Sequence, residues 1–461
     1  MEGVLLPNLK EKLKKNGVKI NPNDPEIEKQ LFEKAELNDR LVTLLADFLG
    51  IYKEGQFTKD EMIESVSKIK SDERERYKDY LILFYDVFDR YQNYLNKRQE
   101  VDFADLLKLG TEKLKKKQFK AKFKRIIVDE YQDISRGRYR FLKAIIDNQT
   151  DCRIMCVGDD WQSIYAFNGS DIKYTFDFDK IFGKTARVDL DKSFRFSQPI
   201  LDVSSRFIQR NPFQLKKEIT SRPSKIKKAI EIINLDYGEE NSLLNIFEAI
   251  NSIRPKNTKW NVYLLGRYKR IAKKNNIFPE VPKEIKSKFK SLNFEFMTIH
   301  KSKGLGADAI IVLNLDAGKY GFPGYIENDP IMNLVRPGEQ DFKNAEERRV
   351  LYVAMTRAKQ KVIFCTNSYF PSEFIDELKT YPEVSFEEKT VINKSYLPCP
   401  SCSNGKLYLK KPKRINGYAW RCSLEPYCIG KAKFCTYCKK YPAVNSNRCI
   451  DPECEDSRIY K

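Results

Sequence analysis

The feature that most constrains the fold of this sequence is a pair of short apolar runs, each of which ends in acidic and polar residues. The first run, residues 126–128, is followed by Asp129 and Glu130, and the second, residues 154–157, is followed by residues 158–160. Similar β-branched runs occur at residues 230–233, 310–313 and 362–364. Runs of strand length that alternate with amphipathic helical patterns are typical of parallel sheets covered by helices. The sequence therefore predicts an α/β protein.

The 461-residue chain is long enough to form several domains. Changes in residue pattern indicate where they divide. We expect a helical region at 1–120, an α/β region at 121–190, a second α/β region at 191–208 and 293–383, an inserted subdomain at 209–292, a linker at 384–398 and a cysteine-rich module at 399–461.

The charge of the chain favours a polyanionic partner. Its 84 Lys and Arg against 64 Asp and Glu give a net charge of +20, and an excess of this size favours nucleic acid over a small acidic metabolite. An anionic membrane surface would attract the same charge, but no apolar run approaches the ~20 residues that span a bilayer. The amino terminus also has no hydrophobic signal core. We therefore expect a cytoplasmic protein that does not enter a membrane.

The acidic turns suggest phosphate chemistry. Side chains at the carboxyl end of a parallel strand reach the ligand crevice, so Asp129 could hold Mg²⁺ while Glu130 orients a nucleophilic water. In the second turn Gln162 could sense a γ-phosphate, and Tyr165 and Phe167 could stack on the bases of a single strand. The alternatives are a solvated acidic turn and an aromatic pair that belongs to the core.

These two segments resemble motifs II and III of the UvrD/Rep family of superfamily-one DNA helicases. The resemblance continues in order along the chain, with residues 191–196 similar to motif IV, 296–305 to motif V and 346–359 to motif VI. The residues at 158–162 and 207–212 favour the helicase IV branch of this family. The resemblance implies two RecA-like domains, the first incomplete, with residues 1–120 as its helical insertion.

The resemblance also implies an activity, 3′–5′ movement on single-stranded or partly duplex DNA with Mg²⁺-ATP, in repair or recombination. The residues that it implies fall into two groups. Nucleotide hydrolysis and binding would involve Asp129, Glu130, Gln132, Asp133, Gln162, Arg195, Gly304 and Arg357, with Arg357 as the arginine finger. DNA contacts would involve Trp161, Tyr165, Phe167, Thr298 and His300. A salt-bridge role for either arginine and a structural role for His300 are the alternatives.

A phosphate-binding loop of the form G-x-x-x-x-G-K-[ST] is expected upstream of Asp129, and nothing there fits it. Gly183-Lys184-Thr185 is rejected, because Phe178 occupies the first required glycine and the segment follows motif III. A late start codon, a split gene whose upstream chain supplies the loop, and a degenerate motor are the explanations left open. A non-hydrolysing DNA-binding accessory protein is therefore the alternative function. Gly306 is a second departure, since relatives commonly have a glutamate there.

Eight of the 11 cysteines lie from Cys399 onward, as two quartets. All-thiolate quartets with close pairs are typical of structural zinc in a reducing compartment, so we expect two zinc ions, with an iron–sulfur cluster as the alternative. The first quartet comprises Cys399, Cys402, Cys422 and Cys428. The second comprises Cys435, Cys438, Cys449 and Cys454.

The cysteine module carries further signals of nucleic-acid binding. From Lys389 onward the chain has 15 Lys and Arg against 5 Asp and Glu. Lys410 and Lys411 could contact phosphates, while Tyr418 and Trp420 could stack on bases. The module resembles the zinc ribbons at the carboxyl end of bacterial type I topoisomerases. A structural or protein-docking role is the alternative.

Overall fold

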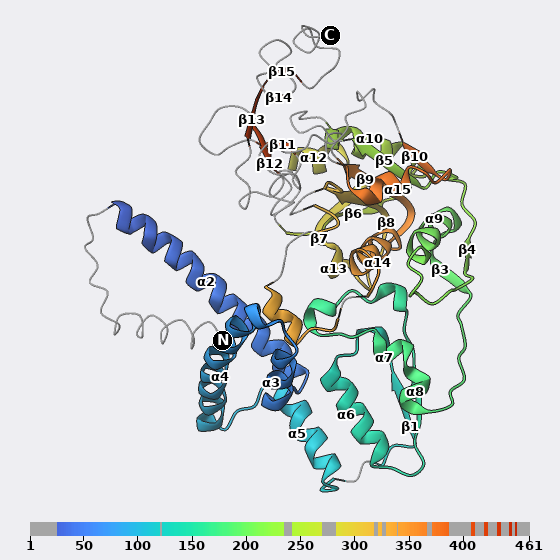
Figure 1. The fold of residues 1–461 in the computed structure, drawn as a ribbon. Helices are drawn as coiled ribbons and strands as arrows, with labels where there is room; N and C mark the ends of the chain where they lie inside the picture. Colours follow the sequence, from blue (N-terminus) through green and yellow to red (C-terminus); the bar gives the residue numbers. More distant parts are fainter. Residues whose placement is uncertain are drawn as a thin grey trace. The chain divides into compact units, whose positions relative to one another are not determined.

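The computed structural model is shown in Figure 1. It describes residues 25–119, 122–234, 242–269, 283–317, 321–324, 329–338, 340–366 and 371–386, and the strand segments 407–410, 419–422, 431–434, 442–444 and 448–449. The chain forms two compact units. Unit 1 comprises Met1–Arg187 with Glu327–Asp341, and unit 2 comprises Val188–Ile326 with Phe342–Lys461.

Unit 1 begins with helices whose aromatic side chains form a common core. They are α2 (Pro25–Glu54), α3 (Lys59–Ser67), α4 (Ser71–Arg98) and α5 (Phe103–Lys115). Phe48 and Phe84 meet edge to face with their ring centroids 4.7 Å apart, and Tyr52 packs on Phe84 at 5.0 Å. Thr58 and Glu61 form a capping box that fixes the start of α3. This part of the chain is helical, as its pattern of Lys, Glu and Leu predicts.

A buried lysine ties α2 to the start of α5. The Lys53 side chain is only 6% exposed, and its ammonium lies 2.7 Å from Asp102 Oδ2 and 2.9 Å from Asp105 Oδ2. Lys53 also donates a hydrogen bond to Gln92 of α4. A buried ammonium is stable only where such groups surround it, so this network fixes how the three helices meet.

The sheet of unit 1 has two strands among the described residues, β1 (Arg125–Val128) and β2 (Arg153–Cys156). They are parallel, and Ile127 lies opposite Met155. One face packs against Leu142 of α6 (Arg136–Asp147) and Tyr174 of α7 (Lys173–Phe176), and α8 (Phe178–Phe182) adds to the same core. This arrangement places the carboxyl ends of both strands, with the acidic turns, side by side.

The core of unit 2 is a six-stranded sheet in the order β10-β5-β9-β8-β6-β7, and every pair in it is parallel. The strands are β5 (Ile230–Asn234), β6 (Trp260–Gly266), β7 (Leu292–Thr298), β8 (Ala307–Leu313), β9 (Ala358–Thr366) and β10 (Val384–Phe386). Val262, Ile311 and Ile363 are fully buried in one cluster with Phe247. The α/β fold with parallel sheets is thereby confirmed.

Two of the expected domain boundaries differ from the structure. Residues 209–292 were expected to form an inserted subdomain, but they contribute β5 and β6 to the six-stranded sheet. The expected linker at 384–398 likewise begins with β10, whose Val384 pairs with Ile230. Lys-rich connecting segments dominate the composition of residues 209–292, and polar residues follow the three-residue strand β10, so neither strand pattern stands out in the sequence. The remainder of the expected linker lies outside the described residues.

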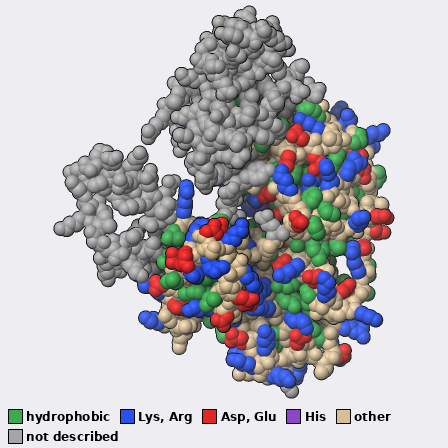
Figure 2. Space-filling model, viewed as in Figure 1, with side chains coloured by type: hydrophobic (Ala, Val, Ile, Leu, Met, Phe, Trp, Pro, Cys, Tyr) green, Lys and Arg blue, Asp and Glu red, His purple; other side chains and the backbone are tan. Residues whose placement is uncertain are grey.

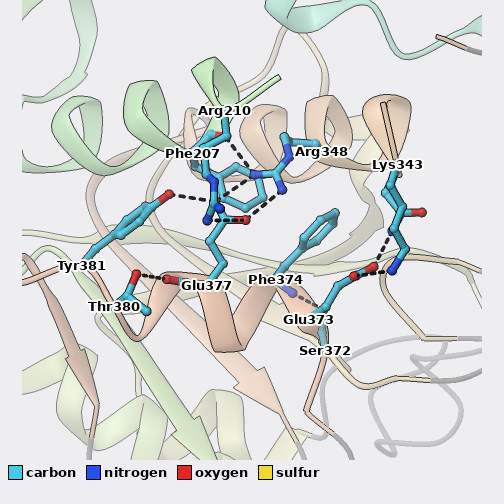
Figure 3. Close-up of polar contacts among 11 residues, drawn as sticks. Phe207, Arg210, Lys343, Arg348, Ser372, Glu373, Phe374, Glu377, Thr380 and Tyr381 are labelled. Atoms are coloured by element: carbon cyan, nitrogen blue, oxygen red, sulfur yellow. Dashed lines mark hydrogen bonds and ion pairs between the residues drawn. The ribbon is translucent and has the colours of Figure 1, made fainter. Parts of the chain in front are cut away.

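The helices of unit 2 include α9 (Gln198–Gln209), α10 (Ser242–Ile253), α12 (Lys283–Lys288), α13 (Ile299–Ser302), α14 (Ala345–Met355) and α15 (Glu373–Leu378). Figure 3 shows the contact that joins α9, α14 and α15. Arg348 donates to both carboxylate oxygens of Glu377, at 2.9 and 2.8 Å, and to the Phe207 carbonyl at 2.9 Å. Two further strands, β3 (Lys192–Ser197) and β4 (Thr220–Arg222), form a separate parallel pair.

The carboxyl-terminal part forms a small antiparallel sheet in the order β11-β12-β13-β14-β15. Its strands are β11 (Leu407–Lys410), β12 (Ala419–Cys422), β13 (Lys431–Phe434), β14 (Pro442–Val444) and β15 (Arg448–Cys449). Trp420 and Cys422 of β12 are buried. None of the helices in the described part of the chain is long and apolar enough to cross a membrane.

Candidate functional site

The turn after β1 holds two adjacent carboxylates. Glu130 has a left-handed backbone conformation, with φ 50° and ψ 41°, and a 3-10 turn (Tyr131–Asp133) follows it. Such a conformation is uncommon for a residue with a side chain and is often found where geometry serves function. The Glu130 amide donates to Asp129 Oδ1 at 2.9 Å, and the Tyr131 amide donates to the Val157 carbonyl at 2.9 Å. Both acids are exposed at the end of the strand.

A buried glutamine connects this turn to the turn after β2. Gln132 is completely buried, and its amide nitrogen donates to Glu130 Oε2. Its amide oxygen accepts from the Asp159 amide at 3.0 Å, and its carbonyl accepts from the Ser163 hydroxyl at 3.1 Å. The sequence suggested Gln132 as a nucleotide contact, whereas the structure places it beneath the acidic turn. There it orients Glu130.

The close approach of the two turns depends on a glycine. A Cβ at Gly158 would lie 2.7 Å from Gln132 Oε1 and 3.2 Å from the Gln132 backbone nitrogen. Contacts of this length require a neighbour to shift, and Gln132 is held by its hydrogen bonds. The glycine is therefore part of the site. The resemblance to motif III covered Gly158 but did not reveal this role.

Asp159 organises the turn after β2. Its Oδ1 accepts from the Trp161 amide at 3.2 Å, and its Oδ2 accepts from the Gln162 side-chain amide at 2.6 Å. Sequence reasoning assigned no role to Asp159, although Asp before a tight turn is a recognisable capping signal. Trp161, expected to contact DNA, is fully buried. It is therefore part of the buried interior and not of the exposed surface of the turn.

A cavity of about 610 Å³ in unit 1 is bordered by the turn after β1 and by residues that follow the turn after β2. Its polar lining includes Asp129, Glu130, Asp133, Tyr165, Asn168, Ser170, Glu54 and Arg138. Burial raises the pKa of Tyr165, and the nearby charges of Asp133 and Glu130 raise it further. The Tyr165 hydroxyl consequently stays protonated at neutral pH. Phe167, 40% exposed, lies with its ring centroid 6.0 Å from that of Tyr165.

The two arginines expected to reach a γ-phosphate differ in environment. Arg195 lies on β3 and is exposed. Arg357, between α14 and β9, is completely buried. It donates to the Val353 carbonyl at 3.1 Å and to Thr356 Oγ1 at 3.2 Å. A motif fixes the position of an arginine in the chain, but the packing around it sets its exposure.

The remaining predicted residues of unit 2 lie at the carboxyl end of β7. Thr298 caps α13, with its hydroxyl accepting from the Lys301 amide at 3.3 Å, and His300 is half-buried on this helix. Gly304 has φ 83°, a conformation that glycine adopts without strain. The chain then enters β8. This turn presents polar backbone and side-chain groups at a strand end, as in unit 1.

The predicted metal ligands of the tail fall mostly outside the described residues. These ligands are Cys399, Cys402, Cys428, Cys435, Cys438 and Cys454. Lys411 and Tyr418, which were predicted to contact DNA, also lie outside the described residues. Of Cys449 only the backbone is described, in β15. Within the described residues there is no group of three side chains suited to a metal ion. Trp420 is 2% exposed and Lys410 lies on β11, so base stacking by Trp420 would need its surroundings to open.

The parallel α/β sheets, with acids at a strand end facing a cavity, are consistent with RecA-like helicase domains. Residues 7–183 match the UvrD/REP helicase N-terminal domain, and residues 280–369 match the UvrD-like helicase C-terminal domain. DNA helicase IV of Escherichia coli is 32% identical over 76% of this chain and 49% of its own length. The ATP-dependent DNA helicase Rep of Buchnera aphidicola is 30% identical over 44% of this chain and 32% of its own. These similarities support assignment of the chain to the UvrD/Rep family.

The chain spans about half the length of DNA helicase IV and about a third of Rep. The family predicted from the motifs is the one that both domain matches describe. The roles of individual residues stay predictions, and the activity of the whole chain is a matter for proposal.

Proposed function

We propose that this chain is the motor part of an ATP-dependent 3′–5′ DNA helicase or translocase that acts on single-stranded or partly duplex DNA, in cytoplasmic DNA repair or recombination. One observation carries the proposal. The Asp129–Glu130 turn, held by the buried Gln132, faces a cavity of about 610 Å³ at the carboxyl end of a parallel strand. The domain matches and the similarity to helicases support the same conclusion.

The acids fit a magnesium site by the chemistry of their donor atoms. Mg²⁺ prefers hard oxygen ligands and keeps several waters, so it needs only one or two carboxylates from the protein. We assign Asp129 to the metal, which would neutralise charge on the phosphates of ATP. Glu130, fixed by Gln132, would orient the attacking water, and Gln162, fixed by Asp159, would respond to the γ-phosphate. Asp133 and Gly304 would add contacts to the nucleotide.

Arginine side chains would stabilise the charge that develops on the transferred phosphoryl group. The exposed Arg195 is available for this contact. The buried Arg357 could reach a nucleotide only after exchanging its contacts with Val353 and Thr356. We therefore propose that Arg195 binds first and that Arg357 acts in a rearranged state.

Single-stranded DNA is the proposed polymer partner. Lys and Arg side chains are spread over the described surface in view (Figure 2), in keeping with the net charge of +20. Tyr165 and Phe167 lie together in unit 1, and Phe167 is exposed enough for a base to stack on it. Thr298 and His300 would contact the strand from unit 2. The buried Trp161 is proposed to support the turn and not to touch DNA.

The tail is proposed to hold two structural zinc ions through its cysteine quartets. Cys422, which is fully buried on β12, supports this assignment because a zinc-bound thiolate is normally shielded from water. Metal analysis of the purified chain should find two zinc ions per molecule and no iron. The same module, through Lys410, Lys411 and Tyr418, would add to DNA binding.

The rival function is a non-hydrolysing DNA-binding accessory protein, or one half of a split helicase. It is favoured by the lack of a G-x-x-x-x-G-K-[ST] segment upstream of Asp129. In the split case a second chain encoded upstream would supply the phosphate-binding loop. The intact acidic turn favours hydrolysis over the accessory role.

Strand displacement from tailed duplexes distinguishes these possibilities. The chain is tested alone and with the upstream-encoded polypeptide: ATP-dependent separation of a duplex with a 3′ single-stranded tail, abolished by Glu130→Gln, would support a motor, and separation only in the mixture would indicate the split helicase. A duplex with a 5′ tail should stay intact. Binding of both substrates with no displacement of either would contradict the motor and favour the accessory protein.

A further inference from the structure

One short segment of unit 1 lies, in sequence, between two elements of unit 2. Glu327–Asp341 follows β8 and precedes α14, and both of these elements belong to unit 2. Within unit 1 the segment contains a 3-10 helix, η4 (Pro330–Leu334). The chain therefore crosses from unit 2 to unit 1 and back again between the segments that resemble motifs V and VI.

This segment is anchored in the helical core of unit 1. Ile331, Met332 and Val335 are at most 3% exposed and belong to the same apolar cluster as the aromatic side chains of α2 and α4. Asp329 caps η4 by accepting from the Ile331 amide at 3.1 Å, and its second carboxylate oxygen accepts from Arg76 of α4 at 2.6 Å. Burial of the three apolar side chains provides most of the hold, because a partly exposed ion pair adds little. We call residues 329–335 the anchor segment.

The chain just before the anchor segment is fixed in unit 2. The Gly324 amide donates to Glu347 Oε2 at 2.9 Å, and Glu347, in the first turn of α14, also accepts from Arg267 at 2.7 and 3.0 Å. The side chains of this arginine and glutamate are 20% and 13% exposed. Arg267 directly follows β6, whose last residue, Gly266, pairs with Thr298 of β7. Glu347 thus joins Gly324 to the strand end at which Thr298 lies.

The connection between these two fixed points is short. Only residues 325–328 separate Gly324 from Asp329, and a fully extended chain gains about 3.6 Å per residue, so these two residues can lie at most about 18 Å apart. The connection after the anchor segment, residues 336–344, is longer. The first connection therefore limits how far the anchor segment can move before it pulls on the contact with Glu347.

We propose that the anchor segment is a tether, through which the helical core of unit 1 holds the Glu347–Arg267 pair at the strand end of unit 2. Glu347 is then a positioning residue that acts through Arg267 on the turn beside Thr298. The tether goes beyond the function proposed above, because it serves a motor and an accessory protein alike. Coupling between two sites is reciprocal, so a ligand that orders the turn beside Thr298 also steadies the anchor segment.

Hydrogen exchange in the purified full-length chain tests the tether. Ile331→Ala removes apolar contact from the anchor segment, and Asp329→Ala removes the cap and the ion pair while it leaves the buried side chains in place. Lys78→Ala is the control, because it breaks an exposed ion pair with Glu75 on the same helix, α4, that carries Arg76. Thermal unfolding of each variant checks that it is folded.

Exchange is followed in the anchor segment and at the two sites that the tether holds, residues 264–268 and 345–352, with residues 310–313 of β8 as an internal reference. Both anchor variants should speed exchange by about tenfold in the anchor segment, since a lost core or cap contact raises the population of locally opened states, and by about threefold at the two held sites. Residues 310–313 and the control variant should not change. Faster exchange confined to unit 1, unchanged exchange in the anchor segment, or equal acceleration at residues 310–313 would each overturn the proposal.

Single-stranded DNA provides a second readout, which rests on the polymer partner proposed above. A short oligothymidine should slow exchange at residues 264–268 and in the anchor segment of the unchanged chain, and the slowing in the anchor segment should be lost in Ile331→Ala. Slowing at residues 264–268 alone would overturn the tether. An absence of any response to DNA would count against the proposed function, and the exchange of the variants without DNA would then decide the tether.

Discussion

Removing Arg348 should destabilise unit 2 more than any exposed arginine would. Its side chain and that of Glu377 are 8% and 9% exposed, and the guanidinium lies 4.3 Å from the centre of the Phe207 ring (Figure 3). Breaking a buried pair from one side typically costs about 3–5 kcal/mol, because the remaining charge stays buried without its partner.

Two groups reduce that cost at this site. The Tyr381 hydroxyl donates to Glu377 at 2.7 Å, and burial raises the pKa of Tyr381, so the hydroxyl stays protonated. Arg210 also lies 3.5 Å from the same carboxylate. With these contacts retained, we expect Arg348→Ala to lower the free energy of unfolding by about 3 kcal/mol, the lower end of that range.

Urea unfolding followed by circular dichroism, with hydrogen exchange in α14 and α15, measures this effect. At a typical slope of about 2 kcal/mol per molar urea, the midpoint of unit 2 should fall by about 1.5 M. Arg90→Ala is the control, because its ion pair with Asp86 is exposed and within one helix, so it should cost about 0.5 kcal/mol or less. Equal midpoints for the two variants would refute the assignment of Arg348 as the centre of this packing.

Three further changes probe unit 1. Burial alone would raise the pKa of Asp102, but hydrogen bonds, first from Lys53, lower it below its usual value. The stability that Asp102 contributes is therefore present above about pH 4 and lost as the pH falls through its lowered pKa. In Lys53→Met, thermal unfolding should show this loss beginning at a higher pH. A pH profile of thermal unfolding that is the same in Lys53→Met and in the unchanged chain would refute the role of Lys53. Gln132→Leu leaves the Asp159 amide without its acceptor and should cost about 1–3 kcal/mol in urea unfolding, whereas a neutral result would show that the turns hold without it. Gly158→Ala should displace the Gln132 side chain and slow ATP turnover without weakening DNA binding, and wild-type turnover would contradict the close approach of the two turns.

The sequence predicted those parts of the site that depend on local pattern. Residues 126–128 and 154–157 are short apolar runs bounded by polar turns, so their strands and the position of Asp129 and Glu130 at a strand end could be predicted. The helical region before them could be predicted from its periodicity. Val384 could not, because a three-residue strand has too few residues to show a period.

Side-chain exposure could not be predicted from the motifs. Gln132, Trp161 and Arg357 were each expected to face a ligand, and each is fully buried. Whether such a side chain points outward depends on neighbours distant in sequence, as Leu305 is for Arg357. The hydrogen bond from the Asp159 amide to Gln132 could not be predicted for the same reason, since it joins turns 27 residues apart.

The most direct test of a motor built on the Asp129–Glu130 turn is ATP hydrolysis, measured with and without single-stranded DNA. The chain should be measured alone and after addition of the upstream-encoded polypeptide, each against Glu130→Gln. We predict turnover that DNA stimulates once the phosphate-binding loop is supplied and that Glu130→Gln abolishes while DNA binding persists. Turnover that is absent in every mixture, or equal in the unchanged chain and in Glu130→Gln, would contradict the account.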